Sequence, residues 1–95
     1  MRKSTHTPEY AALCAEIRTA RKSAGLSQRD LASRLAVPPS WVSKVETGER
    51  RLDLVEFCWV VSTCGIDPLP LFKRLAAEIA RRSSTPKKAR GGQSK

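Results

Sequence analysis

The sequence predicts an all-α fold, with five short helices in one compact domain. Apolar residues recur at steps of three and four along five successive segments, which is the spacing of a single helix face. Capping residues, prolines and glycines separate these segments, and a chain of 95 residues has room for one domain. We therefore expect a flexible arm at residues 1–8, a domain at 9–82 and a disordered basic tail at 83–95, where the apolar spacing ends.

The first helix is expected from about Glu9 to Ala24, with Gly25 as its stop. Its apolar face consists of Tyr10, Leu13, Cys14, Ile17, Ala20 and Ala24. The second helix opens at Ser27, and Asp30 three residues later gives a capping box with a shorter acid than usual. This helix ends near Ala36, and its inner face is formed by Leu31, Ala32 and Leu35.

The third helix is expected to start anew after two consecutive prolines. Pro38 and Pro39 cannot continue the preceding helix because proline has no N–H to donate, whereas Pro39 suits the first turn of the next one. Val42 and Val45 point inward from this helix, which closes at Gly48.

The fourth and fifth helices begin at acidic caps. Asp53 and Glu56 resemble a capping box before the fourth helix. Asp67 is expected to cap the fifth helix, with Pro68 at its first position. The fourth helix ends at Gly65, and its predicted inner face consists of Leu54, Phe57, Cys58, Val61 and Cys64. The predicted inner stripe of the fifth consists of Leu69, Phe72, Leu75, Ala76 and Ile79.

The net charge of +9 is concentrated at the two ends of the chain. Residues 81–95 hold six basic side chains and the first eight residues hold two, with no acid in either stretch. The remaining residues carry ten basic against nine acidic side chains. This balance favours one specific electropositive face over uniform attraction to any polyanion.

The residue types argue against an enzyme, a metal site or a cofactor site. Cys14, Cys58 and Cys64 fall on apolar helix positions without metal-ligand spacing, and the one histidine, His6, lies in the polar arm. No paired acid and base or phosphate-binding loop is present. No apolar run approaches the roughly 20 residues of a membrane span, and no secretion signal precedes the domain, so a cytoplasmic protein is expected.

Residues 17–48 resemble the Cro and phage-repressor type of helix-turn-helix, the XRE family. The shared features are the run G-L-S-Q-x-x-L-A at residues 25–32, the branched pair Val42 and Val45, and E-x-G at residues 46–48. With the last two helices the resemblance covers about residues 9–80. It implies a lambda-repressor-like fold and a bacterial or phage transcriptional regulator. The regulator is expected to be a repressor whose third helix enters the major groove of double-stranded DNA.

The resemblance also assigns roles to individual residues. Base contacts map onto the third helix at Pro39, Ser40 and Lys44. Because a proline ring offers no hydrogen bond, Ser40 and Lys44 are expected to contact bases. Trp41 is expected either to contact a thymine methyl or to pack in the rim of the core. Phosphate contacts are expected at Ser27, Gln28, Ser43, Thr47, Arg50 and Arg51. Arg21 and Glu46 occupy the positions of a structural ion pair.

Two positions depart from the family pattern. Ala36 stands where a glycine is usual, and a left-handed conformation there would cost on the order of 1 kcal/mol. Pro38 replaces the usual serine cap of the third helix and removes a side-chain acceptor.

A homodimer on an inverted-repeat operator is expected, assembled through the C-terminal half. Val55 and Trp59 lie on a second face of the fourth helix, and Leu71 or Leu75 of the fifth could complete the interface; the alternative is that the fifth helix buries Trp59 within one chain.

The competing function is a protein-interaction module, such as an antitoxin that binds a toxin and represses its own operon, or a coactivator that contacts RNA polymerase. RNA binding is disfavoured because A-form grooves do not admit a recognition helix.

Overall fold

The computed structural model describes residues 7–83, which contain five helices and no strand. The helices are α1 (Pro8–Ser23), α2 (Gln28–Leu35), α3 (Pro39–Thr47), α4 (Leu54–Thr63) and α5 (Pro68–Ser83). The predicted all-α fold of five helices is thereby confirmed. Residues 1–6 and 84–95, which include His6 and most of the predicted arm and tail, lie outside the described residues.

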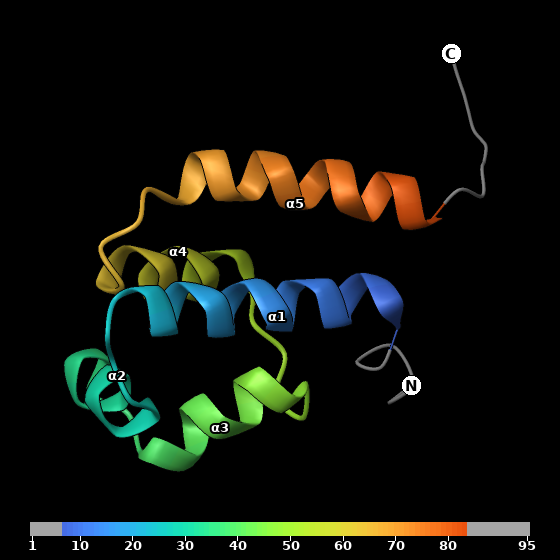
Figure 1. The fold of residues 1–95 in the computed structure, drawn as a ribbon. Coiled ribbons are helices and arrows are strands. Elements are labelled where there is room, and N and C mark those ends of the chain that lie inside the picture. The colour runs from blue at the N-terminus through green and yellow to red at the C-terminus, as the bar shows by residue number, and fades with distance from the viewer. Residues whose placement is uncertain (1–6, 84–95) are drawn as a thin grey trace.

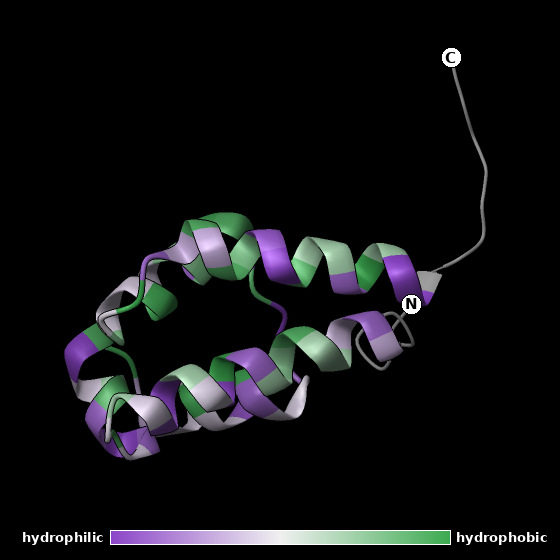
Figure 2. Ribbon diagram, turned by 45° about the horizontal axis from the view of Figure 1, so that its top comes forward, coloured by the Kyte–Doolittle hydropathy of each residue, from purple (hydrophilic) through white to green (hydrophobic). Residues whose placement is uncertain are grey.

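The helices form three levels, as Figure 1 shows. The short helices α2 and α3 lie at one end, α5 lies at the opposite end, and α1 and α4 lie between them. Hydrophobic and hydrophilic residues alternate along the helices in Figure 2, as expected where each helix turns one face to a shared core. This arrangement leaves α3 at the edge of the molecule.

Local capping explains where the helices begin. In the capping box of α2, the Asp30 amide donates to Ser27 Oγ at 2.9 Å and the Ser27 amide donates back to Asp30 Oδ2 at 3.0 Å. Asp53 and Glu56 form the same reciprocal pair before α4. Such side-chain caps are worth about 1 kcal/mol each. In contrast, Pro38 before α3 makes no side-chain cap hydrogen bond.

The turn between α2 and α3 contains a strained residue. Ala36 has φ 60° and ψ 44°, and among the non-glycine residues described it alone has a positive φ. Its Cβ makes this left-handed conformation cost on the order of 1 kcal/mol relative to glycine. The turn is nevertheless closed by the Val37 amide, which donates to the Ala32 carbonyl at 3.0 Å.

The core is formed by all five helices. Its most deeply buried large side chains are Ile17, Leu31, Val42, Val60 and Val61. Cys14 and Cys64 are buried as expected, and Cys58 is half-buried.

The predicted inner faces of α4 and α5 require correction. Leu54, Leu69, Phe72 and Ala76 were expected inside, but all four are exposed, and Val60 and Leu71 are buried in their place. α5 turns Leu71 and Leu75 inward, and the exposed Phe72 packs against Phe57 with ring centroids 6.4 Å apart. The cause is the start of α5: residues 68–72 are apolar on every side, so two stripes have helical spacing and the packing of α1 and α4 selects one.

Candidate nucleic-acid interface

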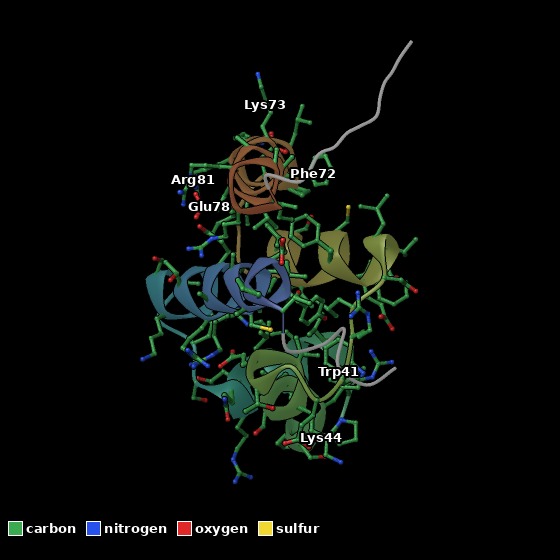
Figure 3. The ribbon with its side chains drawn as sticks, turned by 90° about the vertical axis from the view of Figure 1, so that its right-hand side faces the viewer. Trp41, Lys44, Phe72, Lys73, Glu78 and Arg81 are labelled. Carbon is green, nitrogen blue, oxygen red and sulfur yellow. The ribbon has the colours of Figure 1, made fainter. Side chains whose placement is uncertain are left out.

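The outward face of α3 is small and polar. Val42 and Val45 are fully buried and fix the helix against the core, while Pro39, Ser40 and Lys44 are exposed. Figure 3 shows Lys44 at the bottom of the molecule, pointing away from it, with Trp41 higher up at the side. The residues on either side of the buried valines therefore form a surface that a nucleic-acid groove could meet.

A buried ion pair ties α1 to the end of α3. Arg21 Nε donates to Glu46 Oε2 at 2.6 Å and Arg21 Nη2 donates to Glu46 Oε1 at 3.2 Å, so the contact is bidentate. Glu46 is only 2% exposed. A third guanidinium nitrogen of Arg21 donates to the Leu26 carbonyl at 2.8 Å, so the pair also fixes the start of the α1–α2 connection.

Gln28 joins this network from α2. Its amide nitrogen donates to Glu46 Oε1 at 3.0 Å, so the side chain that was expected to contact a phosphate has a partner inside the protein. Burial raises the pKa of Glu46, but the hydrogen bonds from Arg21 and Gln28 and the charges of Arg21 and Arg18 outweigh it. The pKa of Glu46 therefore lies below its ordinary value, and the carboxylate stays charged at neutral pH.

Two further α1 side chains hold backbone carbonyls of the last turn of α3, and the sequence reading did not identify them. Arg18 Nη2 donates to the Glu46 carbonyl at 3.1 Å, and Cys14 Sγ donates to the Val45 carbonyl at 3.4 Å. The signal was present, because residues 14, 18 and 21 lie on one face of a helix. Carbonyls at the end of a helix lack the usual intrahelical amide donors, so these α1 side chains add donors at the C-terminus of α3; the Val45 carbonyl also accepts from the Gly48 amide at 3.2 Å.

The α3–α4 loop is fastened at three points. Arg50 donates to both carboxylate oxygens of Glu56, at 3.2 and 3.1 Å, and its guanidinium lies 4.8 Å from the centroid of the Trp41 ring. The Arg51 guanidinium lies 4.5 Å from the centroid of the Tyr10 ring. The Tyr10 hydroxyl in turn accepts from the Leu52 amide at 2.8 Å.

These contacts place the remaining predicted site residues. Arg50 and Trp41 are partly buried against each other, so much of the Trp41 ring is covered by the protein. Ser27, Thr47 and Arg51 are exposed and Ser43 is half-exposed; Thr47 Oγ1 donates to the Lys44 carbonyl at 3.2 Å. Ser27 caps α2, and Ser43 and Thr47 lie on α3 at the same end of the molecule, whereas Arg51 lies on the loop that runs from α3 toward α4 (Figure 1).

The residues predicted for dimerisation fall into two groups. Val55 and Trp59 are 56% and 58% exposed on α4, so α5 does not bury Trp59 within one chain. Leu71 and Leu75 are only 3% and 5% exposed, because they pack into the core of their own chain. Their assignment to an intermolecular interface was therefore wrong.

No group of three or more histidine, cysteine, aspartate or glutamate residues in the described part of the chain is arranged to hold a metal ion. Within residues 7–83, no helix has the length and apolar character needed to cross a bilayer.

Comparison with known proteins gives two kinds of likeness. Residues 12–71 match the family model for a helix-turn-helix domain. Among solved structures, the chain is similar to an XRE-family like protein from Pseudomonas syringae pv. tomato str. DC3000, with 43% identity and a TM-score of 0.73 over 80% of this chain and 93% of that one. No curated protein matches the chain.

A second solved structure, the clp gene regulator ClgR from Corynebacterium glutamicum, has a similar fold. It is 23% identical, with a TM-score of 0.67, over 82% of this chain and 83% of that one. At this identity the likeness extends to the fold alone.

Proposed function

This chain belongs to the XRE-like helix-turn-helix family and is a DNA-binding transcriptional regulator, and we propose that it represses transcription by inserting α3 into the major groove of an inverted-repeat operator. The observation that carries the proposal is the way α3 is held. Its inner side is fixed by two buried valines and by the Arg21–Glu46 pair, while its outer side presents exposed polar residues. A rigid reading surface loses little conformational freedom on binding.

Lys44 is the principal base-contacting residue in this proposal. Its ammonium group projects from the exposed side of α3, where it can donate to guanine O6 or N7. Ser40 lies one turn earlier on the same side and supplies a hydroxyl. Trp41 contributes its uncovered edge as an apolar contact to a thymine methyl.

Phosphate contacts surround this reading surface. The first turn of α2, next to Ser27 and Gln28, lies at the positive end of the helix dipole, which favours an anion. On the other side of α3 we assign Ser43, Thr47, Arg50 and Arg51 to the DNA backbone. Such contacts position the protein without selecting sequence.

Repression follows from occupancy, since a protein bound over a promoter excludes polymerase without any further contact. Two copies related by a two-fold axis would place their α3 helices about 34 Å apart, one helical turn of DNA. The operator is then an inverted repeat, and the protein acts in the compartment that holds the chromosome, the bacterial cytoplasm. No catalytic step or cofactor is part of this proposal.

The experiment is a selection of bound fragments from a random duplex pool, followed by affinity measurements for three proteins. Lys44→Ala should weaken binding by about 1 to 3 kcal/mol and relax the preference at one base pair of each half-site. Lys73→Ala is the matched control, because Lys73 projects from α5 at the opposite end of the molecule in Figure 3 and carries the same charge. Equal loss in the two variants, or no enriched sequence for the wild type, contradicts the assignment.

A further inference from the structure

Arg50 contacts α3 with both its backbone and its side chain. Its amide donates to the Lys44 carbonyl at 3.1 Å, and its guanidinium lies 4.8 Å from the centroid of the Trp41 ring. Lys44 and Trp41 are three residues apart and are therefore neighbours on the surface of α3. One loop residue thus touches two of the residues to which we assign base contacts.

The guanidinium of Arg50 is held by acceptors outside α3. Nη1 donates to the Arg51 carbonyl at 3.0 Å and to Glu56 Oε1 at 3.2 Å, and Nη2 donates to Glu56 Oε2 at 3.1 Å. Two parallel hydrogen bonds to one carboxylate set the plane of a guanidinium as well as its position. Glu56 supplies both carboxylate oxygens, so it determines where the cation lies over the indole ring.

Glu56 is itself held at the start of α4. Its Oε1 accepts from the Asp53 amide at 3.1 Å, which closes the capping box of that helix. The hydrogen bonds from Arg50 and from the Asp53 amide lower the pKa of Glu56, so the carboxylate is charged at neutral pH. A continuous series of contacts therefore runs from the first turn of α4 through Arg50 to Trp41.

A contact with a methyl group requires that the Trp41 ring keep one position. Trp41 is half-buried at the rim of the core, closer to the body of the molecule than Lys44 in Figure 3, and the Arg50 cation lies over its ring. Exposed side chains change rotamer within nanoseconds, whereas a ring held between the core and a cation keeps its place. A gap of about 0.5 to 1 Å already forfeits a quarter to a half of the dispersion attraction, so a small rotation of the ring would remove a methyl contact.

We propose that Glu56 is a positioning residue for base recognition, which acts through Arg50 to keep the edge of Trp41 against a thymine methyl group in the major groove. This role of Glu56 rests on the proposed function, whereas the arrangement of the three side chains belongs to the free protein. Glu56 lies on α4 and is not among the residues that we assign to DNA. Discrimination at one base pair therefore depends on a residue that touches no base.

The first test observes Trp41 in the free protein. The variants are made in a Trp59→Phe background, because the exposed Trp59 would otherwise dominate the fluorescence quenching. Glu56→Gln leaves an amide that can still cap α4, but it removes the charge and one of the two acceptors that hold Arg50. Acrylamide should then quench Trp41 more strongly, and the fast component of its anisotropy decay should grow. Glu16→Gln, which removes the same charge from an ion pair between α1 and α5, should change neither.

The second test measures recognition of the methyl group in the selected operator. Each thymine of a half-site is replaced in turn by deoxyuridine, which lacks only the C5-methyl group. At one position this should weaken wild-type binding by about fourfold, as expected for one methyl group taken out of water. In Glu56→Gln the factor should fall toward one, while the affinity for random duplex should not fall, because the variant loses a negative charge.

Two controls show whether Glu56 acts through Trp41. Glu16→Gln should keep the thymine factor of the wild type, because its ion pair lies away from Arg50. Trp41→Leu should lack the factor whether residue 56 is glutamate or glutamine, since the ring that meets the methyl group is gone.

Two results would overturn the positioning role: Trp41 quenching that is unaltered in Glu56→Gln, or a thymine factor that this variant retains. Equal losses of operator and random-duplex affinity would make Glu56 a general support of the fold, and the positioning role would be wrong. A wild type that distinguishes thymine from deoxyuridine at no position would remove the methyl contact and the role of Glu56 in recognition with it. No enriched sequence for the wild type contradicts the DNA-binding proposal itself, and the quenching of Trp41 then still decides whether Glu56 holds the ring.

Discussion

Arg21 and Glu46 form a bidentate ion pair that joins α1 to the last turn of α3 inside the protein. Both residues are buried, and Arg21 is the nearer of the two cations that face the Glu46 carboxylate, since Arg18 lies 3.7 Å from it. Removing one partner of such a pair leaves an unpaired charge in a medium of low polarity, which is more costly than losing the attraction itself. The orientation of α3 therefore depends on a buried pair, to which Gln28 of α2 also donates.

The first prediction is that Arg21→Ala lowers the free energy of unfolding by about 3 to 5 kcal/mol, the cost of stranding a buried carboxylate. Urea unfolding followed by circular dichroism measures it. Arg74→Ala is the control: the Arg74–Glu16 pair has a similar distance, 3.0 Å, but Arg74 is exposed, so its loss should cost about 0 to 1 kcal/mol. Comparable losses in the two variants would contradict a structural role for the buried pair.

The second prediction concerns acid. The pKa of Glu46 is lowered in the folded protein, so between that value and its ordinary value of about 4.3 the unfolded chain binds more protons than the folded one. The stability contributed by Glu46 is therefore complete above its ordinary pKa and is lost as the pH falls through the folded pKa. Unfolding free energies measured across the acid range should rise with pH, and Glu46→Gln should show a shallower rise. An identical slope in the variant would show that Glu46 does not carry the dependence.

Sequence spacing predicted the helices well because their limits are set locally. The reciprocal caps at Ser27 and Asp53 involve residues three apart, and the structure contains both. The buried side of α5 could not be predicted in this way, because it depends on where α1 and α4 lie. For the same reason, the sequence did not predict that Arg50 stacks on Trp41 and pairs with Glu56. These two contacts join the loop to α3 and to α4.

The third prediction tests the strained turn. Ala36→Gly should stabilise the protein by up to about 1 kcal/mol, because glycine adopts the left-handed conformation without a Cβ penalty. Ala24→Gly is the matched control: Ala24 also ends a helix and is exposed, but its φ is −81°, so glycine there should lower stability through the greater freedom of the unfolded chain. The melting temperatures of both variants, compared with that of the wild type, test this prediction. A lower melting temperature for Ala36→Gly would contradict the strain at Ala36.

The fourth prediction concerns the charge of the residues that follow Ser83. Residues 84–95 contain four basic and no acidic side chains, so a chain ending at Ser83 should release fewer counterions on binding. Its log affinity for duplex DNA should fall less steeply with log salt, whereas the selected sequence should stay the same. An unchanged salt slope would exclude the segment from DNA binding, and a changed sequence preference would give it a role in base recognition.

The last prediction distinguishes positioning from contact at Arg18. Its guanidinium donates to the Glu46 carbonyl at the negative end of α3, and its Nε lies 3.7 Å from the buried Glu46 carboxylate. Arg21 and Gln28 still donate to that carboxylate in the variant, so Arg18→Ala should cost the fold about 0.3 to 1 kcal/mol at the helix end and about 0 to 1 kcal/mol for the ion pair. The same change frees the last turn of α3, which carries Lys44, and should reduce the ratio of operator to random-duplex affinity several-fold. Arg18→Lys keeps the charge and should recover part of this ratio.

The salt dependence of operator binding is the decisive readout, because a positioning residue leaves the slope of log affinity against log salt unchanged, whereas loss of a phosphate contact lowers it by about one. A lowered slope with an unaltered affinity ratio would make Arg18 a phosphate contact and remove it from the support of α3.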